Sequence, residues 1–202
     1  MKAEIGITGL VVMYVGNLED YQGIDLLLQS FALVLKKQDS VDLVIIGGDA
    51  DGIGRYRMKS RDLDIGSKVH FLGPRPVELL PSFLSQADIL VSPRTKGNNT
   101  PMKVYPYLQS GKPVLATKLP THTQILNSKV AMLAEPNPKH FSDAMLRLIN
   151  DENARQLLGM AGKMLAEEQF SYTAFRAKFN DFMDWLENEL VRQSGRQSKA
   201  LS

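Results

Sequence analysis

The sequence predicts an α/β fold, namely a Rossmann-like parallel sheet of about six strands flanked by helices, with extra helices at the C-terminus. Short apolar runs alternate with longer segments of helical periodicity as far as residue 133. The apolar runs are nearly continuous, as is typical of strands that a parallel sheet buries on both faces. The chain has 202 residues, 44% of them hydrophobic, so it is long enough to bury a core of its own.

Each element is predicted from its own pattern. The apolar runs that end at glycine, proline or polar residues predict strands at 10–15, 41–46, 69–72, 87–91, 113–116 and 130–133. Helical spacing of apolar residues predicts helices at 24–37, 54–63, 77–86, 101–110, 121–126, 140–149, 152–169 and 172–192. Because the strands are parallel, their carboxyl ends share one edge of the sheet, and ligands of such folds bind there.

The predicted domain organisation has three parts. Residues 1–9 form a lead-in or linker, residues 10–192 form one domain, and the polar residues 193–202 form a disordered tail. The last helix carries an apolar stripe made of Phe175, Phe179, Phe182, Trp185 and Leu186. We favour docking of this stripe onto the domain's own core, and a helix that partly covers a neighbouring domain is the alternative.

Composition excludes several classes of protein. The chain has no cysteine, which excludes disulfides and thiolate metal sites and fits a reducing compartment. Its 24 basic and 22 acidic residues nearly balance, and few aromatic residues lie between the lysines, which argues against nucleic-acid binding. There is no apolar stretch of membrane-spanning length and no signal-peptide pattern. We therefore expect a cytoplasmic protein.

The first three strand-end loops contain turn residues that also suit a ligand. The loop 16–23 begins and ends with glycine, and such a turn lets the backbone approach a phosphate. Gly48 follows the second strand, and Arg75 lies between two prolines after the third, where rigid main-chain groups can face a base edge. A plain turn is the favoured interpretation of the first and third loops and an equal alternative for the second. None contains a GxGxxG or P-loop fingerprint.

The stretch after the fourth strand is the most informative. Thr100 and Pro101 predict a helix start, with Thr100 as the N-cap and its free amides facing the strand-end crevice. Three cations surround this start, namely Arg94, Lys96 and Lys103. A helix start favours an anion by about 0.3–1 kcal/mol per charge. The stretch therefore predicts an anion site.

Acidic residues are missing from the same region. No aspartate or glutamate lies between Asp88 and Glu135. This span holds the basic or titratable residues Arg94, Lys96, Lys103, Lys112, Lys118, His122 and Lys129. The asymmetry predicts a crevice of positive potential that suits a diphosphate, and a chance fluctuation is the alternative.

Several segments in this order resemble a known family. They are YVGNLEDYQGIDLLLQSF, LVIIGG, KVHFLGP, ADILVSPR, PMKVYPYLQSGKPVLAT and THTQIL. Together they resemble the C-terminal domain of family-4 (group 1) retaining glycosyltransferases of the GT-B fold, from about residue 10 to 192. The resemblance implies binding of a nucleotide-diphosphate-sugar donor, with an N-terminal acceptor-binding domain of the same parent chain as partner. It also implies transfer with retained configuration, no essential metal and no cofactor, and a fragment that is inactive alone.

The sequence departs from the family pattern at three positions. Asn17 and Gln22 are neutral where members carry arginine and lysine, and Pro106 replaces a glutamate. Arg94 and Lys103 match one branch of the family, and the resemblance implies that they are catalytic by neutralising the departing diphosphate. The expected donor-binding residues are Gly16, Asn17, Gln22, Gly23, Gly48, Arg75, Lys96, Asn98, Asn99 and Thr100.

We expect the diphosphate to lie across the amides of Gly16 and Asn17 and the helix start at Thr100. His122 either touches the sugar or is a surface or N-cap-adjacent histidine. The alternatives for the whole chain are a degenerate, non-catalytic GT-B scaffold or half of a nucleotide-sugar epimerase, although the acid-free span offers an epimerase few acid–base groups. The parent enzyme is expected in the cytoplasm, with peripheral membrane association as a further option because many relatives use lipid acceptors.

Overall fold

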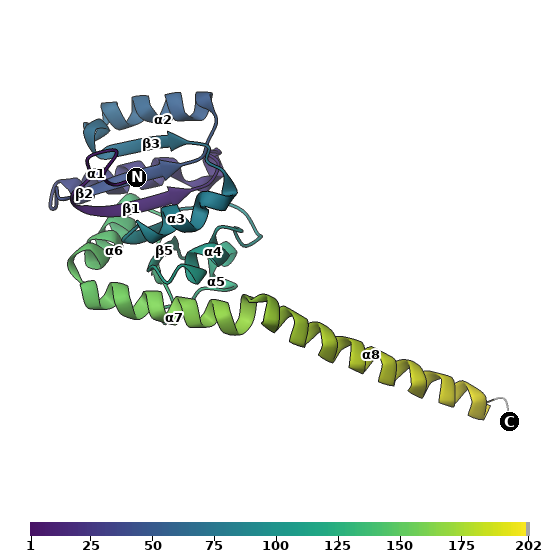
Figure 1. The fold of residues 1–202 in the computed structure, drawn as a ribbon. Helices are drawn as coiled ribbons and strands as arrows, with labels where there is room; N and C mark the ends of the chain where they lie inside the picture. Colours follow the sequence, from purple (N-terminus) through teal and green to yellow (C-terminus); the bar gives the residue numbers. More distant parts are fainter. Residues whose placement is uncertain (201–202) are drawn as a thin grey trace. The chain divides into compact units, whose positions relative to one another are not determined.

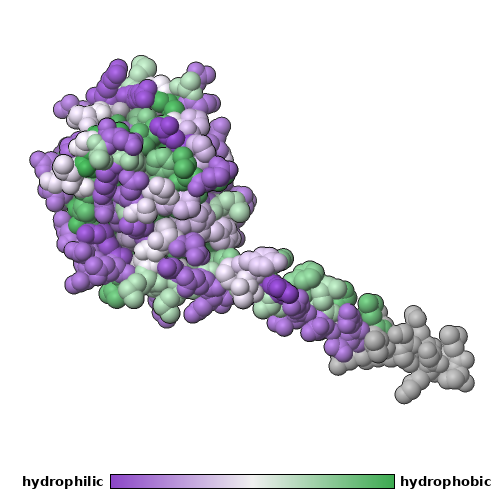
Figure 2. Space-filling view, viewed as in Figure 1, coloured by the Kyte–Doolittle hydropathy of each residue, from purple (hydrophilic) through white to green (hydrophobic). Residues whose placement is uncertain are grey.

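The computed structural model describes the backbone of residues 1–200 and the side chains of residues 1–190 (Figure 1). It consists of two compact units, Met1–Met164 and Leu165–Ser202. The first unit holds the sheet, and hydrophilic residues cover most of its visible face, with scattered apolar residues between them (Figure 2).

The sheet has six parallel strands in the order β3-β2-β1-β4-β5-β6. The strands are β1 (Leu10–Val15), β2 (Val41–Ile46), β3 (Val69–Gly73), β4 (Ile89–Ser92), β5 (Val114–Thr117) and β6 (Met132–Ala134). This arrangement confirms the predicted fold class. Chain order runs outward from β1 in both directions, so the crevice at the carboxyl ends of β1 and β4 is the topological switch point.

Helices join the strands and flank the sheet (Figure 1). In the first unit they are α1 (Ile24–Leu35), α2 (Ala50–Asp62), α3 (Leu80–Ser85), α4 (Val104–Gln109), α5 (Pro120–Thr123) and α6 (Pro138–Asn150), with 3-10 turns η1 (Asp20–Gln22), η2 (Gly66–Lys68) and η3 (Val77–Leu79). Helix α7 (Glu152–Phe170) spans the boundary of the two units, and α8 (Tyr172–Ala200) follows.

Two helix starts show why the predicted bounds shift. Helix α2 begins at Ala50, four residues before the predicted start, because the Asp49 side chain accepts a hydrogen bond from Gly52 N at 2.8 Å. Helix α6 begins at Pro138, and its N-cap Asn137 accepts from His140 N at 3.0 Å. Polar caps therefore set both starts upstream of the first apolar residue.

The core lies on both faces of the central strands. Val11, Val12, Met13 and Tyr14 of β1 are all fully buried, so both faces of this strand are covered, and Phe31 of α1 packs in the same cluster as Val12 and Tyr14. Burial of both strand faces explains why β1 reads as a continuous apolar run, and the predicted bounds of β1 and β2 are the observed ones.

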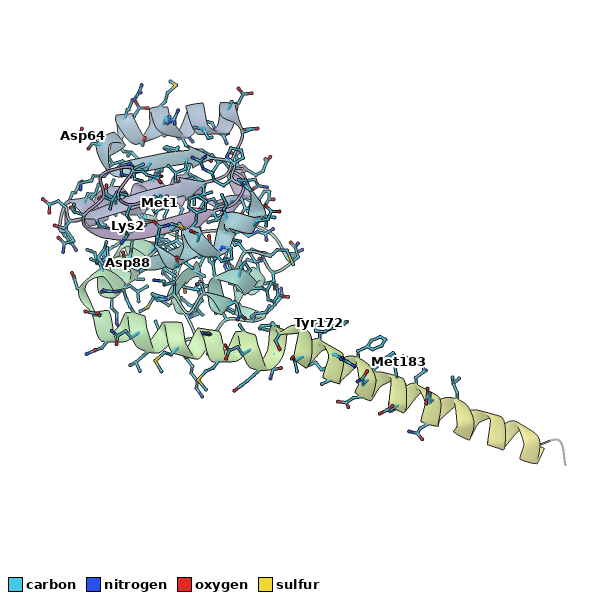
Figure 3. All side chains as sticks on the ribbon, viewed as in Figure 1. Met1, Lys2, Asp64, Asp88, Tyr172 and Met183 are labelled. Carbon is cyan, nitrogen blue, oxygen red and sulfur yellow. The ribbon has the colours of Figure 1, made fainter. Side chains whose placement is uncertain are left out.

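The structure shows a side-chain contact in the segment predicted as a lead-in and helical backbone in the segment predicted as a disordered tail. Lys2 pairs with Asp88, Nζ to Oδ2 at 2.8 Å, so part of residues 1–9 packs on the first unit (Figure 3). Helix α8 runs to Ala200, across most of the stretch for which a disordered tail is predicted. Residues 201 and 202 lie outside the described residues. Among the residues that are described, no helix is long and apolar enough to cross a membrane.

The second unit carries the apolar stripe along α8. Phe175 stacks on Phe179 with ring centroids 6.1 Å apart, and Phe182 stacks on Trp185 at 5.9 Å. All four side chains are exposed. Docking of the stripe stays a prediction.

Candidate functional site

The candidate site lies at the switch point of the sheet. Strand β1 ends at Val15 and its neighbour β4 ends at Ser92, so the loops that follow leave the sheet in adjacent positions. Thr95 N donates to Tyr21 O at 2.9 Å, which joins the loop after β4 to the loop after β1. The two loops therefore form one rim at the carboxyl edge.

Gly16 turns the chain at the end of β1 and leaves room for a lysine. Its φ of 151° is rare for residues with a side chain, and a Cβ atom here would lie 2.6 Å from Lys103 Nζ and 2.9 Å from Tyr14 Oη. Gly16 N donates to Ile46 O at 2.9 Å, so the predicted use of this amide for a diphosphate is wrong: the sheet already takes it. The Asn17 amide has no acceptor among the described residues and is exposed.

Lys103 reaches the turn after β1 from the other loop. Its Nζ lies 3.1 Å from Gln22 Oε1 and 3.8 Å from the centroid of the Tyr14 ring. Burial and, to a smaller extent, the positive charge of Arg94 lower the pKa of Lys103 to about 7. No carboxylate among the described residues forms an ion pair with Lys103. The site therefore holds an ammonium group that has dipolar neighbours and no counter-ion.

Arg94 organises its own loop. Its Nε donates to Lys96 O at 2.8 Å, and its Nη1 and Nη2 donate to Asn99 O and Asn99 Oδ1 at 3.0 and 3.2 Å. The guanidinium carbon lies 5.0 Å from the centroid of the Tyr21 ring, and the residue is 8% exposed. Three of the five N–H groups of Arg94 are thus engaged inside the protein, so Arg94 fixes the shape of the loop as well as contributing its charge.

Helix α5 and the residue after it hold the same loop from the opposite side. Thr121 Oγ1 donates to Asn99 O at 2.7 Å, and Gln124 Nε2 donates to Asn98 O at 2.7 Å. Together with Arg94, these side chains satisfy the carbonyls of three loop residues.

Because side chains of the protein bind these three carbonyls, the peptide N–H group that follows each carbonyl faces the opposite way. All peptide bonds are trans, so the N–H of each following residue points opposite to its carbonyl. The amides concerned belong to Gly97, Asn99 and Thr100, and none donates to an acceptor among the described residues. We call these three N–H groups the amide array. Such an array attracts an anion without any side chain.

The predicted helix start at Thr100 is wrong. Helix α4 begins at Val104, where Val104 N donates to Pro101 O at 3.0 Å and closes a turn before the helix. The local Thr-Pro signal is overridden because Asn99, the residue before it, is fixed by tertiary bonds from Arg94 and Thr121. The exposed amides of the region belong to the loop and not to a helix terminus.

The structure brings together some predicted site residues and separates others. Gly23, with a left-handed φ of 78°, packs against Pro93 O next to the loop of Arg94. Gly48 packs against Leu18, on the far side of the turn after β1. Lys96 is exposed on the rim, and Arg75 is exposed in the loop after β3, without a hydrogen bond or ion pair to the other predicted site residues in the described part of the chain.

His122 lies in the short helix α5, close to its N-cap Leu119, but it is not on the surface. It is fully buried, its Nε2 lies 2.8 Å from Ser92 Oγ, and its Nδ1 lies 3.0 Å from Thr117 O. Burial lowers its pKa to about 4, the charges of Arg94 and Lys103 add to this effect, and the bond to Thr117 O opposes it. A buried, fully bonded ring cannot touch a sugar.

Two tyrosines of the site were not predicted. Tyr14 Oη donates to Asn17 O at 2.6 Å, and Tyr107 Oη accepts from Val15 N at 2.7 Å. Burial raises the pKa of both phenols, so both stay neutral. A hydroxyl within an apolar strand such as LVVMYV is the signal that marks Tyr14 in the sequence.

Comparisons with known proteins found a matching family model and similar relatives. Residues 2–164 match the family model described as glycosyl transferases group 1. The D-inositol 3-phosphate glycosyltransferase of Corynebacterium diphtheriae is 29% identical over 160 residues, which cover 75% of this chain and 37% of the relative. That of Corynebacterium glutamicum is 27% identical over 202 residues and covers 94% and 47%. The chain thus spans less than half the length of these relatives.

Solved structures share the fold at low sequence identity. HepE from Anabaena in complex with UDP superposes with a TM-score of 0.81 at 17% identity, covering 91% of this chain and 51% of that one. The C-terminal domain of the group 1 family protein LpcC from Francisella tularensis has a TM-score of 0.74 at 21% identity and covers 84% and 91%.

Proposed function

The chain belongs to the glycosyl transferases group 1 family, and on this premise we propose that its first unit is the donor-binding half of a retaining glycosyltransferase. The donor is a nucleotide-diphosphate sugar, and an acceptor-binding domain of the same parent chain completes the enzyme. The difference in length between this chain and its relatives supports the second domain.

One observation carries the proposal: an ammonium group without a carboxylate partner and a set of free amides lie in the loops that follow the neighbouring strands β1 and β4. Lys103 lies against the turn after β1, the Asn17 amide is free beside it, and the amide array follows Arg94 in the neighbouring loop. No aspartate or glutamate occurs between Asp88 and Glu135. A diphosphate supplies the negative charge that such a rim lacks.

The same groups suit the leaving diphosphate of a glycosyl transfer. Lys103 and the amides are fixed before the ligand arrives, so they stabilise the charge that develops as the bond between sugar and phosphate breaks. The acid-free span offers no carboxylate nucleophile, which favours a retaining path through the leaving group itself. We include no metal ion and no cofactor in this proposal.

The structures of similar fold suggest the first ligand to test. HepE was solved with UDP and with UDP-glucose. We therefore choose UDP as the first probe, and GDP and ADP as alternative nucleotides. The sugar stays open.

The experiment measures nucleotide binding by thermal shift and then by calorimetry. UDP, GDP or ADP should raise the Tm, since a ligand that binds the folded state stabilises it. Replacing Lys103→Met should weaken the binding of that nucleotide about tenfold, the equivalent of ~1.4 kcal/mol. Lys129→Met, an exposed lysine of the same acid-free span, is the matched control and should leave affinity unchanged. Equal losses in both variants would contradict a local role for Lys103.

A degenerate scaffold is the second candidate, because Asn17, Gln22 and Pro106 replace charged residues expected from the family pattern. A scaffold predicts no thermal shift with any of the three nucleotides. The half of an epimerase is not favoured by the comparisons. We further propose that the isolated chain transfers no sugar, which a UDP-release assay with and without the remaining half of the parent chain tests. Membrane association of the parent enzyme also stays a proposal.

A further inference from the structure

A buried chain of hydrogen bonds links the ends of two strands to the loop of the amide array. His122 Nε2 lies 2.8 Å from Ser92 Oγ at the end of β4. His122 Nδ1 lies 3.0 Å from both the carbonyl and the hydroxyl oxygen of Thr117 at the end of β5. Thr117 Oγ1 donates to Arg94 O at 2.5 Å. Ser92, Thr117 and His122 are all 0% exposed.

The positions of the hydrogens in this chain follow from its connectivity. Thr117 Oγ1 has one hydrogen and gives it to Arg94 O, so it can only accept from His122. The Thr117 carbonyl can also only accept. Nδ1 of His122 must therefore carry a proton. In a neutral ring Nε2 is then bare and accepts from the Ser92 hydroxyl, which leaves every group satisfied.

This serine–histidine pair is not a nucleophilic dyad. Both residues are 0% exposed, so solvent reaches neither side chain. A nucleophile must be reachable by the substrate. The pair therefore acts on the protein itself.

We propose that His122 is a positioning residue of the donor site: its neutral, Nδ1-protonated ring ties the ends of β4 and β5 together and, through Thr117, fixes the carbonyl of Arg94 where the loop begins. This inference rests on the proposed function, since the loop matters only if it binds the donor. Without the hydrogen bonds from His122 to Thr117 and from Thr117 to Arg94 O, the start of the loop is no longer fixed, and neither is the amide array.

The surroundings of the ring keep it neutral. Burial disfavours the charged form, and the positive charges of Arg94 and Lys103 act in the same direction, so the pKa of His122 falls to about 4. A second proton would sit on Nε2 and force the Ser92 hydroxyl to turn its own hydrogen away. Neutrality is thus a requirement of the network.

The first test determines which ring nitrogen of His122 carries the proton. The chain has three histidines, so the ring of His122 can be assigned by comparison with His70→Asn and His140→Asn variants in nitrogen-15 NMR spectra. We expect the Nδ1–H form of His122 at pH 7 without titration down to pH 5. A ring protonated on Nε2, or a ring that titrates near its ordinary pKa, would overturn the inference.

The second test reads the effect on the site. Thr117→Val keeps the shape of the side chain but removes its hydroxyl, and we expect UDP, or whichever nucleotide binds, to bind at least fivefold more weakly. Thr117→Ser keeps the hydroxyl and should restore affinity. Thr123→Val changes an exposed threonine of α5 and is the matched control. Circular dichroism at the assay temperature shows that each variant is folded.

A third variant covers the case in which Thr117→Val fails to fold. Ser92→Ala removes the other bond of the ring and should weaken nucleotide binding, whereas Ser85→Ala, at an exposed serine, should not. If the wild-type chain binds no nucleotide, the proposed function fails. If it binds and these variants bind equally well, the function stands and the positioning role of His122 is wrong.

Discussion

The ammonium group of Lys103 lies 3.8 Å from the centre of the Tyr14 ring, against the glycine that ends the first strand. The ring offers a cation its negative face, and Gln22 offers an amide oxygen at 3.1 Å. Both partners are neutral, so they orient the lysine without cancelling its charge. This charge remains for an anion at the rim, and four predictions follow from the site.

Nucleotide affinity should fall as the pH rises above 7. In the free protein the pKa of Lys103 is about 7, and a bound diphosphate raises this pKa because it stabilises the ammonium form. Between the two pKa values binding takes up a proton, so affinity decreases with rising pH by up to about tenfold per unit. Calorimetry from pH 7 to pH 9 measures this slope. Lys103→Arg should bind with a flat profile because arginine stays charged, and a flat wild-type profile would rule out Lys103 as the linked group.

Gly16→Ala should destabilise the protein and weaken nucleotide binding together. The new Cβ atom would lie 2.6 Å from Lys103 Nζ, and the φ of 151° is unfavourable for alanine. Strain of this kind costs about 1–3 kcal/mol, measured as the free energy of unfolding in urea. Gly54→Ala, where no atom lies within 4 Å of the added group, is the control and should be neutral or stabilising. Wild-type stability in Gly16→Ala would show that Lys103 moves aside freely.

The free energy of unfolding should fall as the pH drops from 6.5 towards 4, partly because of His122. Its pKa is lowered from 6.5 to about 4 in the folded protein. Between these two pH values the imidazole therefore binds a proton in the unfolded chain but not in the folded chain. The stabilisation is fully present above pH 6.5 and is lost towards pH 4, with a size of ~3 kcal/mol at ~1.4 kcal/mol per pKa unit. Urea unfolding across this range should show a shallower slope for His122→Asn than for wild type. The exposed His140→Asn should keep the wild-type slope.

Tyr107→Phe should cost stability through a backbone group of β1. The Val15 amide donates to Tyr107 Oη at 2.7 Å, and without the hydroxyl this N–H lies against an apolar ring. A buried donor without a partner costs about 1–3 kcal/mol, which unfolding in urea detects. Tyr172→Phe changes a tyrosine that is 77% exposed and should be silent. Equal stability of the two variants would show that water replaces the lost hydroxyl.

Much of the fold could be predicted because its signals are local. The run that forms β1 is apolar without interruption, the run that forms β2 contains one polar residue, Asp42, and the predicted bounds of both are the observed ones. The start of α4 could not be predicted, because Asn99 is held by Arg94 and by Thr121, and these bonds override the Thr-Pro signal beside it. A local pattern gives no information about bonds that come from a distant part of the chain.

The site was predicted as a set of residues but not as a geometry. Lys103 and Gln22 both stand in the predicted set, yet their contact joins positions 81 residues apart. The engagement of the Gly16 amide by Ile46 depends on which strand lies next to β1, and the sequence does not state this order. The role of each site residue stays a prediction until binding is measured.

Because the carbonyls around Arg94 are held inward, the outward groups of that loop are peptide N–H groups, which every residue except proline possesses. Substitutions at Lys96 or Asn98 leave these carbonyl bonds in place, whereas Asn99 also holds the loop through its side-chain oxygen. On the proposed function, such substitutions would alter the chemistry presented to a sugar while the main chain keeps its hold on the phosphate. Sugar preference could then change during evolution without loss of the anchor that nucleotide sugars share.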